Sequence, residues 1–225
     1  MTTLYYRPRW SVLVFAGMLT MALALSLSSP AIAKKKSFYQ QTNLVSDLPD
    51  LAAHTDPHLV NPWGMSRSST SPFWVSDNGK GVTTLYNGSG QGFPLGSPLV
   101  VTIPPPAGSP GPSTPTGQVF NGTSDFVVGS GCPPASGDCP SLFIFATEDG
   151  TISGWNPFVP AFLSTTAIRK VDNSATGAVY KGLAIGSTAS GNFLYAANFH
   201  DGTIDVFDKN FALASLAGRA IALKV

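Results

Sequence analysis

Short apolar runs alternate with clusters of Gly, Asn, Asp and Pro along most of the chain. Phe73–Ser76, Val82–Tyr86 and Leu99–Ile103 are rich in Val, Thr and aromatic residues, and the cluster Asp77–Gly81 separates the first two. Runs of this composition bounded by turn formers predict β-strands, and such a cluster is typical of a hairpin turn. With a further strand around Gly64–Ser66, the pattern predicts a four-stranded antiparallel meander.

The same pattern occurs three times. Each repeat has a first marker glycine, a second marker glycine and a following aromatic residue: Gly64, Gly81 and Tyr86; Gly117, Gly150 and Trp155; Gly182, Gly202 and Phe207. The two glycines are 17, 33 and 20 residues apart in the three repeats. Removing Gly129–Ser141 gives the middle repeat the spacing of the third, so we interpret this segment as an insertion.

A repeat of four strands is the unit of a β-propeller blade. We therefore predict an all-β fold, a β-propeller-like array of four-stranded antiparallel blades with about three blades, at 61–103, 116–172 and 180–225. Pro104–Thr116 is expected to be an extended surface connection. Ala212–Val225 would supply the fourth strand of the last blade. Phe38–Val45, within an N-terminal segment at 34–60, is a candidate for an extra, ring-closing strand.

The chain resembles an uncharacterised family of secreted bacterial proteins in five runs: Asn61–Gly64, Glu148–Asn156, Tyr180–Ala184, Tyr195–Phe199 and Gly202–Phe207. The resemblance covers about Gln41–Phe211. It implies a propeller fold, and a PEP-CTERM sorting tail in some members, but no activity, because the family has no established function. Its members continue into further blades, so by this resemblance the present chain looks C-terminally truncated at Val225.

Composition narrows the functional classes. Hydrophobic residues make up 43% of the 225 residues and charged residues only 11%, with a formal net charge of +1. A nearly neutral chain without a basic stripe argues against a nucleic-acid partner. A chain rich in apolar residues and poor in charge also differs from the composition of disordered proteins.

The N-terminus has the features of an export signal. Arg7 and Arg9 precede the uncharged stretch Trp10–Ala33, which ends in small residues after an apolar core. This arrangement predicts a signal peptide over 1–33 with cleavage between Ala33 and Lys34. The expected location is therefore the periplasm, the cell surface or the extracellular space. The alternative is an uncleaved segment, which would be the only contact with a membrane.

Cys132 and Cys139 are the only cysteines of the chain. In an oxidising compartment they predict a small disulfide-closed loop. A redox or metal pair is the alternative, but the spacing differs from Cys-x-x-Cys and no His lies close in sequence.

The meander geometry also predicts where a binding site would lie. The residues before the first strand and those of the second hairpin turn share one face of a propeller. That face would carry these polar candidates: Asn61, Asp77, Asn78, Glu148, Asp149, Lys181, Asn198, His200 and Asp201.

These candidates have two interpretations. Their oxygen atoms suit Ca²⁺ or another hard divalent cation, with Glu148, the only Glu of the chain, as a weak candidate ligand. Alternatively, Asp and Asn in hairpin turns bond their own backbone and bind nothing. We favour the second interpretation and predict no cofactor.

Other candidates carry weaker signals. His54, Asp56 and His58 form a short cluster that is either a metal loop or an ordinary surface connection, and we favour the latter. Trp63, Trp74 and Trp155 are interpreted as core residues of the blades. Gly-x-Ser-x-Gly does not occur, so serine-nucleophile chemistry lacks a motif.

Three functional classes remain. The first is an exported, non-catalytic scaffold that binds a protein or a glycan on its propeller face, and we favour it. The second is a metal-dependent hydrolase of the lactonase or esterase kind, an analogy at the level of the fold alone. The third is a truncated fragment without function.

Overall fold

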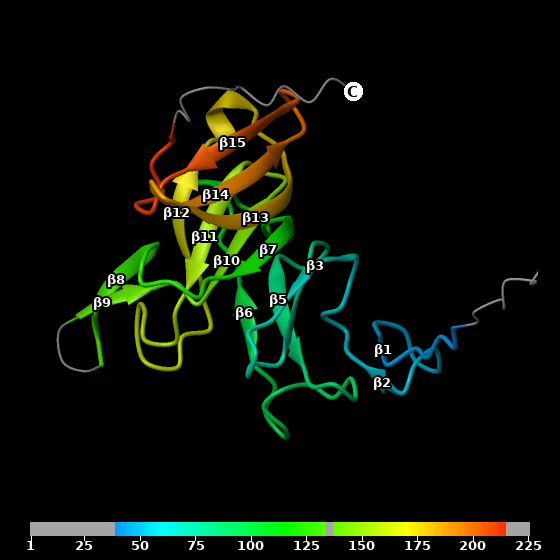
Figure 1. The fold of residues 1–225 in the computed structure, drawn as a ribbon. Helices are drawn as coiled ribbons and strands as arrows, with labels where there is room; N and C mark the ends of the chain where they lie inside the picture. Colours follow the sequence, from blue (N-terminus) through cyan, green and yellow to red (C-terminus); the bar gives the residue numbers. More distant parts are fainter. Residues whose placement is uncertain (1–38, 134–136, 215–225) are drawn as a thin grey trace, which may run out of the picture. The chain divides into compact units, whose positions relative to one another are not determined.

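The computed structural model describes residues 39–133 and 137–214 (Figure 1). The chain divides into two compact units, Met1–Gln41 and Thr42–Val225, and the description below concerns the second. The predicted signal segment 1–33, its cleavage site at Ala33 and Lys34, and most of Ala212–Val225 lie outside the described residues. Within the described part, no helix has the length and apolarity needed to cross a lipid bilayer.

The fold is all-β, with three main antiparallel sheets that follow one another in chain order (Figure 1). The first sheet has the order β3-β4-β5-β6, the second β12-β11-β10-β7 and the third β13-β14-β15. Their bounds are β3 Pro62–Ser66, β4 Phe73–Asp77, β5 Val82–Tyr86, β6 Val100–Thr102, β7 Pro115–Phe120, β10 Phe143–Thr147, β11 Thr151–Trp155, β12 Ile168–Asp172, β13 Tyr180–Thr188, β14 Gly191–Asn198 and β15 Thr203–Phe207.

The four-stranded meanders predicted for the first two repeats are present. The predicted insertion contains the hairpin of β8 (Val127–Cys132) and β9 (Gly137–Pro140), which pair only with each other among the described strands. Cys132 and Cys139 form the predicted disulfide, with 5.4 Å between their Cα atoms. The segment before β7 contains no strand until Pro115, as expected of a proline-rich connection.

The third repeat differs from the first two. Its sheet has three strands among the described residues, and beyond β15 only an isolated bridge joins Phe207 to Leu213. A single 3-10 turn, η1 (Ser174–Thr176), precedes this sheet. No closed barrel or propeller is identified in the described part of the chain, so the result at this level is an all-β array of antiparallel sheets.

The first marker glycines lie where the first strands of successive sheets meet. β3 contacts β7, and β7 contacts β13. A Cβ atom added to Gly64 would lie 2.3 Å from the Thr116 carbonyl oxygen, and one on Gly117 would lie 2.2 Å from the Leu183 backbone nitrogen. Such an approach of two backbones leaves no room for a side chain. These glycines therefore set the spacing between the sheets.

The second marker glycines have a different physical role. Gly81, Gly150 and Gly202 have φ values of +67°, +79° and +65°. This left-handed region is accessible to glycine without steric cost, and the tight turn between the second and third strands requires it. The repeat read from the sequence thus corresponds to two structural requirements, one for packing and one for a turn.

Apolar residues fill both spaces between neighbouring sheets. Trp74 of β4 stacks on Phe143 of β10 at 4.2 Å and lies 4.8 Å from Trp155 of β11, measured between ring centroids. Between the second and third sheets, fully buried residues include Ile152, Leu194 and Phe207. Trp74 and Trp155 are therefore core residues, as the sequence predicts.

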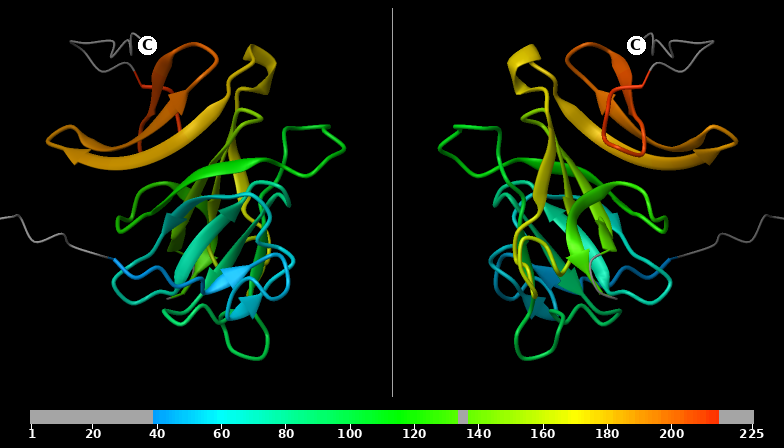
Figure 2. Two further views of the ribbon diagram at one scale, coloured as in Figure 1. Left: turned by 90° about the vertical axis from the view of Figure 1, so that its right-hand side faces the viewer. Right: turned by 90° about the vertical axis from the view of Figure 1, so that its left-hand side faces the viewer.

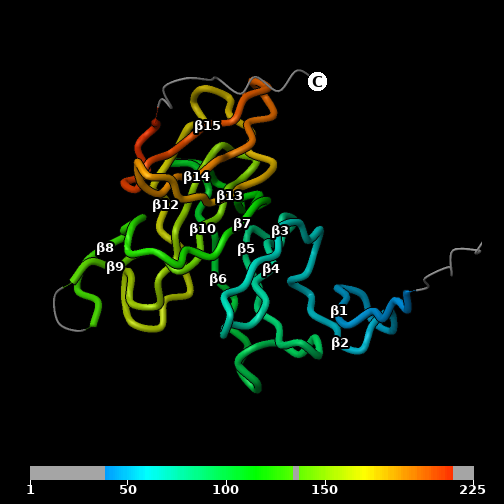
Figure 3. The backbone as a smooth tube through the Cα atoms, in the orientation of Figure 1, coloured from blue at the N-terminus to red at the C-terminus, as the bar shows by residue number. Residues whose placement is uncertain are grey.

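The segment before the first sheet forms a small sheet of its own. β1 (Val45–Ser46) pairs in parallel with β2 (His54–Thr55). Of the candidate ring-closing strand Phe38–Val45, only Val45 lies in a strand among the described residues, and it pairs with β2. The described part of this segment therefore does not form the predicted ring-closing strand. Figure 3 traces the chain from this segment through the three sheets, and Figure 2 shows the long β13–β14 hairpin of the third sheet.

Candidate functional site

Four of the predicted site residues form one hydrogen-bonded network that joins all three sheets. The Asn61 amide nitrogen donates to Asn78 Oδ1 at 3.0 Å, and Asn78 Nδ2 donates to Glu148 Oε2 at 2.7 Å. Lys181 Nζ donates to the other carboxylate oxygen, Oε1. Asn61 and Asn78 flank strands of the first sheet, Glu148 follows β10 and Lys181 lies on β13. The turns after β4 and β10 thus meet the first strand of the third sheet at this point.

Two exposed aromatic rings flank the lysine of this network. Lys181 Nζ lies 4.9 Å from the ring centroid of Trp63 and 6.0 Å from that of Phe199. Trp63 is 45% exposed and Phe199 73% exposed. The interpretation of Trp63 as a core residue is therefore wrong: it lies on β3 with its ring exposed beside Lys181. A cation at this distance is attracted to the ring faces.

The surroundings of Glu148 hold it in the ionised form. Partial burial alone would raise the pKa of its carboxyl group, but the hydrogen bonds from Lys181 and Asn78, with the positive charge of Lys181, outweigh this effect. The pKa of Glu148 therefore lies below its ordinary value. Both carboxylate oxygens accept hydrogen bonds from nitrogen donors of other sheets. The carboxylate thus works as a bridge between sheets.

Asp77 does not belong to this surface. Its side chain is fully buried, and Oδ2 accepts a hydrogen bond from the Thr84 hydroxyl at 2.8 Å, whereas Oδ1 has no hydrogen-bond partner. Burial raises the pKa of Asp77 to about 7, the Thr84 hydrogen bond opposes the shift and the negative charge of Asp56 adds to it. Asp77 is therefore a buried acid beneath the surface.

Two further candidates belong to a separate network in the third sheet. Asn198 Nδ2 donates to Asp201 Oδ2 at 2.9 Å and to Asp205 Oδ2 at 3.1 Å, and the Tyr180 hydroxyl donates to the same Asp205 oxygen at 3.0 Å. Burial, together with the negative charge of Asp205, raises the pKa of Tyr180 despite a hydrogen bond from Asn173. These contacts close a hairpin turn internally.

The last two candidates have local partners. Asp149 Oδ1 accepts hydrogen bonds from the backbone nitrogen and the hydroxyl of Thr114, at 3.2 Å and 2.8 Å, and thereby holds the chain just before β7. His200 Nε2 lies 3.9 Å from Asp201 Oδ1 in an exposed turn. Among the described residues, no three His, Cys, Asp or Glu side chains lie close enough together to hold a metal ion.

The N-terminal His cluster is organised around Asp56. Asp56 Oδ1 lies 2.9 Å from His58 Nδ1, and Asp56 Oδ2 accepts a hydrogen bond from the Tyr86 hydroxyl at 2.9 Å. His54 lies on β2 and lines the same pocket as Asp56 and His58. Asp56 thus attaches the N-terminal segment to β5, which agrees with the structural interpretation of this cluster.

A groove runs along the stacked first strands beside the Glu148 network. Three equivalent tripeptides line it: Trp63–Met65 of β3, Thr116–Gln118 of β7 and Lys181–Leu183 of β13. Gln118 Nε2 crosses from the second sheet to donate to the Gly64 carbonyl at 2.8 Å. Two residues of this surface were missed from the sequence: Phe199 was not among the candidates, and Trp63 was interpreted as a core residue rather than an exposed one. The sequence signal that could have found them is their position, because Trp63 directly precedes the marker glycine Gly64 and Phe199 directly follows the candidate Asn198.

The chain is similar to uncharacterised proteins of a virus. It is 34% identical over 170 residues to the uncharacterised protein R648 of Acanthamoeba polyphaga mimivirus, covering 75% of this chain and 38% of that protein. It is 35% identical over 170 residues to the uncharacterised protein L690 of the same virus, covering 75% of this chain and 41% of that protein. A third protein of this virus, R640, is 38% identical over 73 residues. The chain spans about two fifths of the length of the first two relatives.

These relatives correct one expectation. No family model matches the chain. The matching proteins are viral and uncharacterised, so the assignment to a family of secreted bacterial propellers is wrong, and nothing supports a PEP-CTERM sorting tail or a truncation relative to that family. The printed names of the relatives state no activity.

Proposed function

We propose that this protein is an exported, non-catalytic binding module, a propeller-like array of blades whose ligand site is the surface formed by Trp63, Lys181 and Phe199. The observation that carries the proposal is the exposure of two aromatic rings on either side of a lysine whose position is fixed by Glu148. Exposed aromatic side chains that surround an ordered polar group are typical of binding surfaces.

The propeller-like arrangement is part of this proposal. Three consecutive sheets contact through their first strands, each with a marker glycine at the same position. Radial stacking of sheets through their innermost strands is the organisation of a propeller. In that organisation the groove along Trp63–Met65, Thr116–Gln118 and Lys181–Leu183 faces the axis.

The chemistry of the surface suits a glycan. A saccharide presents apolar ring faces and hydroxyl groups side by side, and the site offers both kinds of partner. The rings of Trp63 and Phe199 supply flat apolar faces. The Asn61 amide donates one hydrogen bond to Asn78 and has the capacity for more, and Lys181 carries three donors of which Glu148 takes one.

Export fits the disulfide. Cys132 and Cys139 are bonded, and structural disulfides are typical of oxidising compartments. The N-terminal segment 1–33 supports the same location by its sequence pattern. A glycan partner would be met in such a compartment.

The hydrolase alternative would assign Glu148 a different role. A carboxylate that binds a metal ion or acts as a base needs oxygen lone pairs directed at the metal or substrate. Here both oxygens accept hydrogen bonds from Asn78 and Lys181. Because these hydrogen bonds occupy both oxygens of Glu148, the arrangement favours a binding module over a metal-dependent hydrolase.

The proposal is tested by titrating the purified protein with chitohexaose, maltohexaose and oligogalacturonate while following tryptophan fluorescence. We expect saturable binding of at least one probe, weakened about fivefold or more by Trp63→Ala or Phe199→Ala because an aromatic contact contributes about 1 kcal/mol or more. Phe162→Ala is the matched control, since this ring is also exposed, at 69%, but lies in the loop after β11.

Two outcomes would contradict the proposal. The first is the absence of saturable binding by any of the three probes. The second is turnover of a lactone or ester panel in the presence of Ca²⁺ or Zn²⁺ that Glu148→Gln abolishes, which would establish the hydrolase instead.

A further inference from the structure

The charges of the proposed binding site are paired. Among the described residues that line the groove along the first strands, Lys181 alone is charged. Its Nζ donates to Glu148 Oε1, and both side chains are partly exposed, at 33% for Lys181 and 27% for Glu148. Because the pKa of Glu148 is lowered, its carboxylate is ionised at neutral pH. The positive charge that a ligand meets in this groove is therefore neutralised within the protein.

The carboxylate is fixed beside the lysine by a second bond. Asn78, which is only 8% exposed, donates to Glu148 Oε2 at 2.7 Å, so the carboxylate cannot turn away from Lys181 without losing this bond. On its other side, Lys181 Nζ lies 4.9 Å from the ring centroid of Trp63. A carboxylate and an aromatic ring face each stabilise an ammonium charge. The ammonium group is thus held between two favourable partners.

This arrangement treats neutral and anionic ligands differently. A hydroxyl group of a neutral sugar can accept a hydrogen bond from Lys181, because an ammonium group has three donors and Glu148 takes one. A ligand carboxylate that approaches the same nitrogen also approaches the carboxylate of Glu148, whose like charge repels it. Like charges brought together in a binding site lower the affinity for the wrong ligand and so set specificity.

We propose that Glu148 makes this site selective for neutral saccharides and excludes acidic ones, such as chains of uronate sugars. This selectivity rests on the proposed function and names its class of ligand. Glu148 acts on the ligand through Lys181 and is therefore a positioning residue. Selectivity requires the negative charge of Glu148, whereas a purely structural bridge between the sheets requires only its hydrogen bonds.

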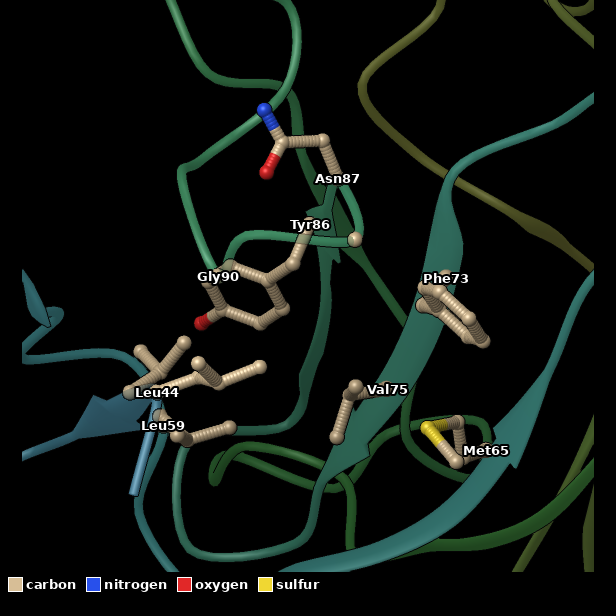
Figure 4. Close-up of a pocket in the computed structure, with 10 residues that line it drawn as sticks. Leu44, Leu59, Met65, Phe73, Val75, Tyr86, Asn87 and Gly90 are labelled. Carbon is tan, nitrogen blue, oxygen red and sulfur yellow. The ribbon is translucent and has the colours of Figure 1, made fainter. Parts of the chain in front are cut away.

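Dependence on charge also distinguishes this site from another groove of the first sheet. Leu44 and Leu59 of the N-terminal segment lie opposite Phe73 and Val75 across an apolar groove of about 410 Å³ (Figure 4). None of the described residues that line this apolar groove is charged. A saccharide bound there would not respond to a change of charge at Glu148, so a response assigns the ligand to the groove beside Lys181.

The test compares saccharides that differ only in charge. Maltohexaose is paired with the same chain oxidised to a carboxylate at the hydroxymethyl carbon of each sugar, and oligogalacturonate is paired with its methyl ester. Tryptophan fluorescence of the purified protein gives the dissociation constant of each. We expect at least one neutral chain to bind about fivefold or more tightly than its acidic counterpart. Repulsion between two unit charges about 4 Å apart changes a dissociation constant about fivefold in water, and more near a protein surface.

Glu148→Gln should remove this selectivity. We expect its affinity for the acidic chain to rise about fivefold or more, with the affinity for the neutral chain nearly unchanged, because Lys181 loses its counter-charge. High salt should abolish the gain by screening the exposed ammonium group. The double variant Glu148→Gln, Lys181→Gln should show no gain. Asp138→Asn is the control for net charge, since it removes one carboxylate from an exposed position on β9.

The comparison on the unchanged protein decides without any variant. Equal affinities for a neutral chain and its acidic counterpart would overturn the selectivity, and so would a folded Glu148→Gln variant whose ratio of the two affinities is unchanged. Binding of acidic chains alone would count against the selectivity and leave the proposed function standing. The absence of binding by any of the chains would overturn both.

Discussion

Substitution of Gly117 by alanine tests how the sheets pack. The added Cβ atom would lie 2.2 Å from the Leu183 nitrogen, 2.6 Å from the Gly182 carbonyl carbon and 2.9 Å from its Cα atom. All three are backbone atoms of β13, so no side-chain rotation relieves the overlap. The third sheet would have to move away from the second by more than 1 Å to restore ordinary contact, roughly the difference between 2.2 Å and a normal separation.

Such a displacement loosens the apolar core between these two sheets. Overpacking of a well-packed interior typically costs about 1 to 3 kcal/mol, and a clash between two backbones belongs at the upper end. We therefore expect Gly117→Ala to lower the free energy of unfolding by about 3 kcal/mol. For a chain of this size that loss corresponds to a decrease in Tm of about 6 to 12 °C.

Gly182→Ala is the matched control for this substitution. It makes the same chemical change at the equivalent position of the next repeat, where the nearest described atom would be at 4.0 Å. We expect its free energy of unfolding to stay within about 0.5 kcal/mol of the unchanged protein, or to rise slightly. Urea denaturation followed by tryptophan fluorescence measures both. Equal stabilities of the two variants would refute the proposed role of Gly117 in sheet packing.

Three further predictions concern ionisation and the disulfide. Glu148→Gln should lower the free energy of unfolding by no more than about 1 kcal/mol at neutral pH, because the ion pair with Lys181 is partly exposed. Since the pKa of Glu148 is lowered in the folded state, this difference should disappear as acid protonates the carboxylate. Urea denaturation along a pH series measures it, and a difference that persists in acid would contradict the prediction. Asp77→Asn should stabilise the protein above pH 7 and have little effect below pH 4. The pKa of Asp77 is about 7 in the folded state, so the folded protein loses stability as the pH rises from the pKa of the unfolded chain to that of the folded state, and asparagine removes this loss. An effect that does not depend on pH would contradict the prediction. Joint replacement of Cys132 and Cys139 by serine should cost about 2 to 3 kcal/mol in calorimetry, and an unchanged Tm would contradict the assignment of a stabilising loop closure.

Much of the fold was predictable because its determinants are local. β4 and β5 are short runs of β-branched and aromatic residues, and the glycines between such runs have positive φ because the turn demands it. The insertion in the second repeat was predictable from the spacing of Gly117 and Gly150 alone. The predicted fourth strand of the third repeat falls largely on residues outside the described part, so it stays a prediction.

The candidate site was predictable only in part, because its contacts are not local. The sequence placed Asn78, Glu148 and Lys181 on one face, but not that they bond to one another. Asp77 is fully buried and its carboxylate bonds to Thr84 of the next strand, whereas a hairpin-turn pattern predicts an exposed side chain. The composition of the run around Trp63 predicts a core residue, but its contact with Lys181, a residue of the third repeat, is not local, and the ring stays exposed.

The central claim is that the surface around Trp63, Lys181 and Phe199 binds a glycan. Its most direct test is NMR chemical-shift mapping of isotopically labelled protein during a titration with the oligosaccharide that binds most tightly. The account predicts saturable shifts of the Trp63 indole, the Phe199 ring and the backbone amides next to Lys181, with the core indoles of Trp74 and Trp155 unchanged. Shifts confined to another surface would contradict it.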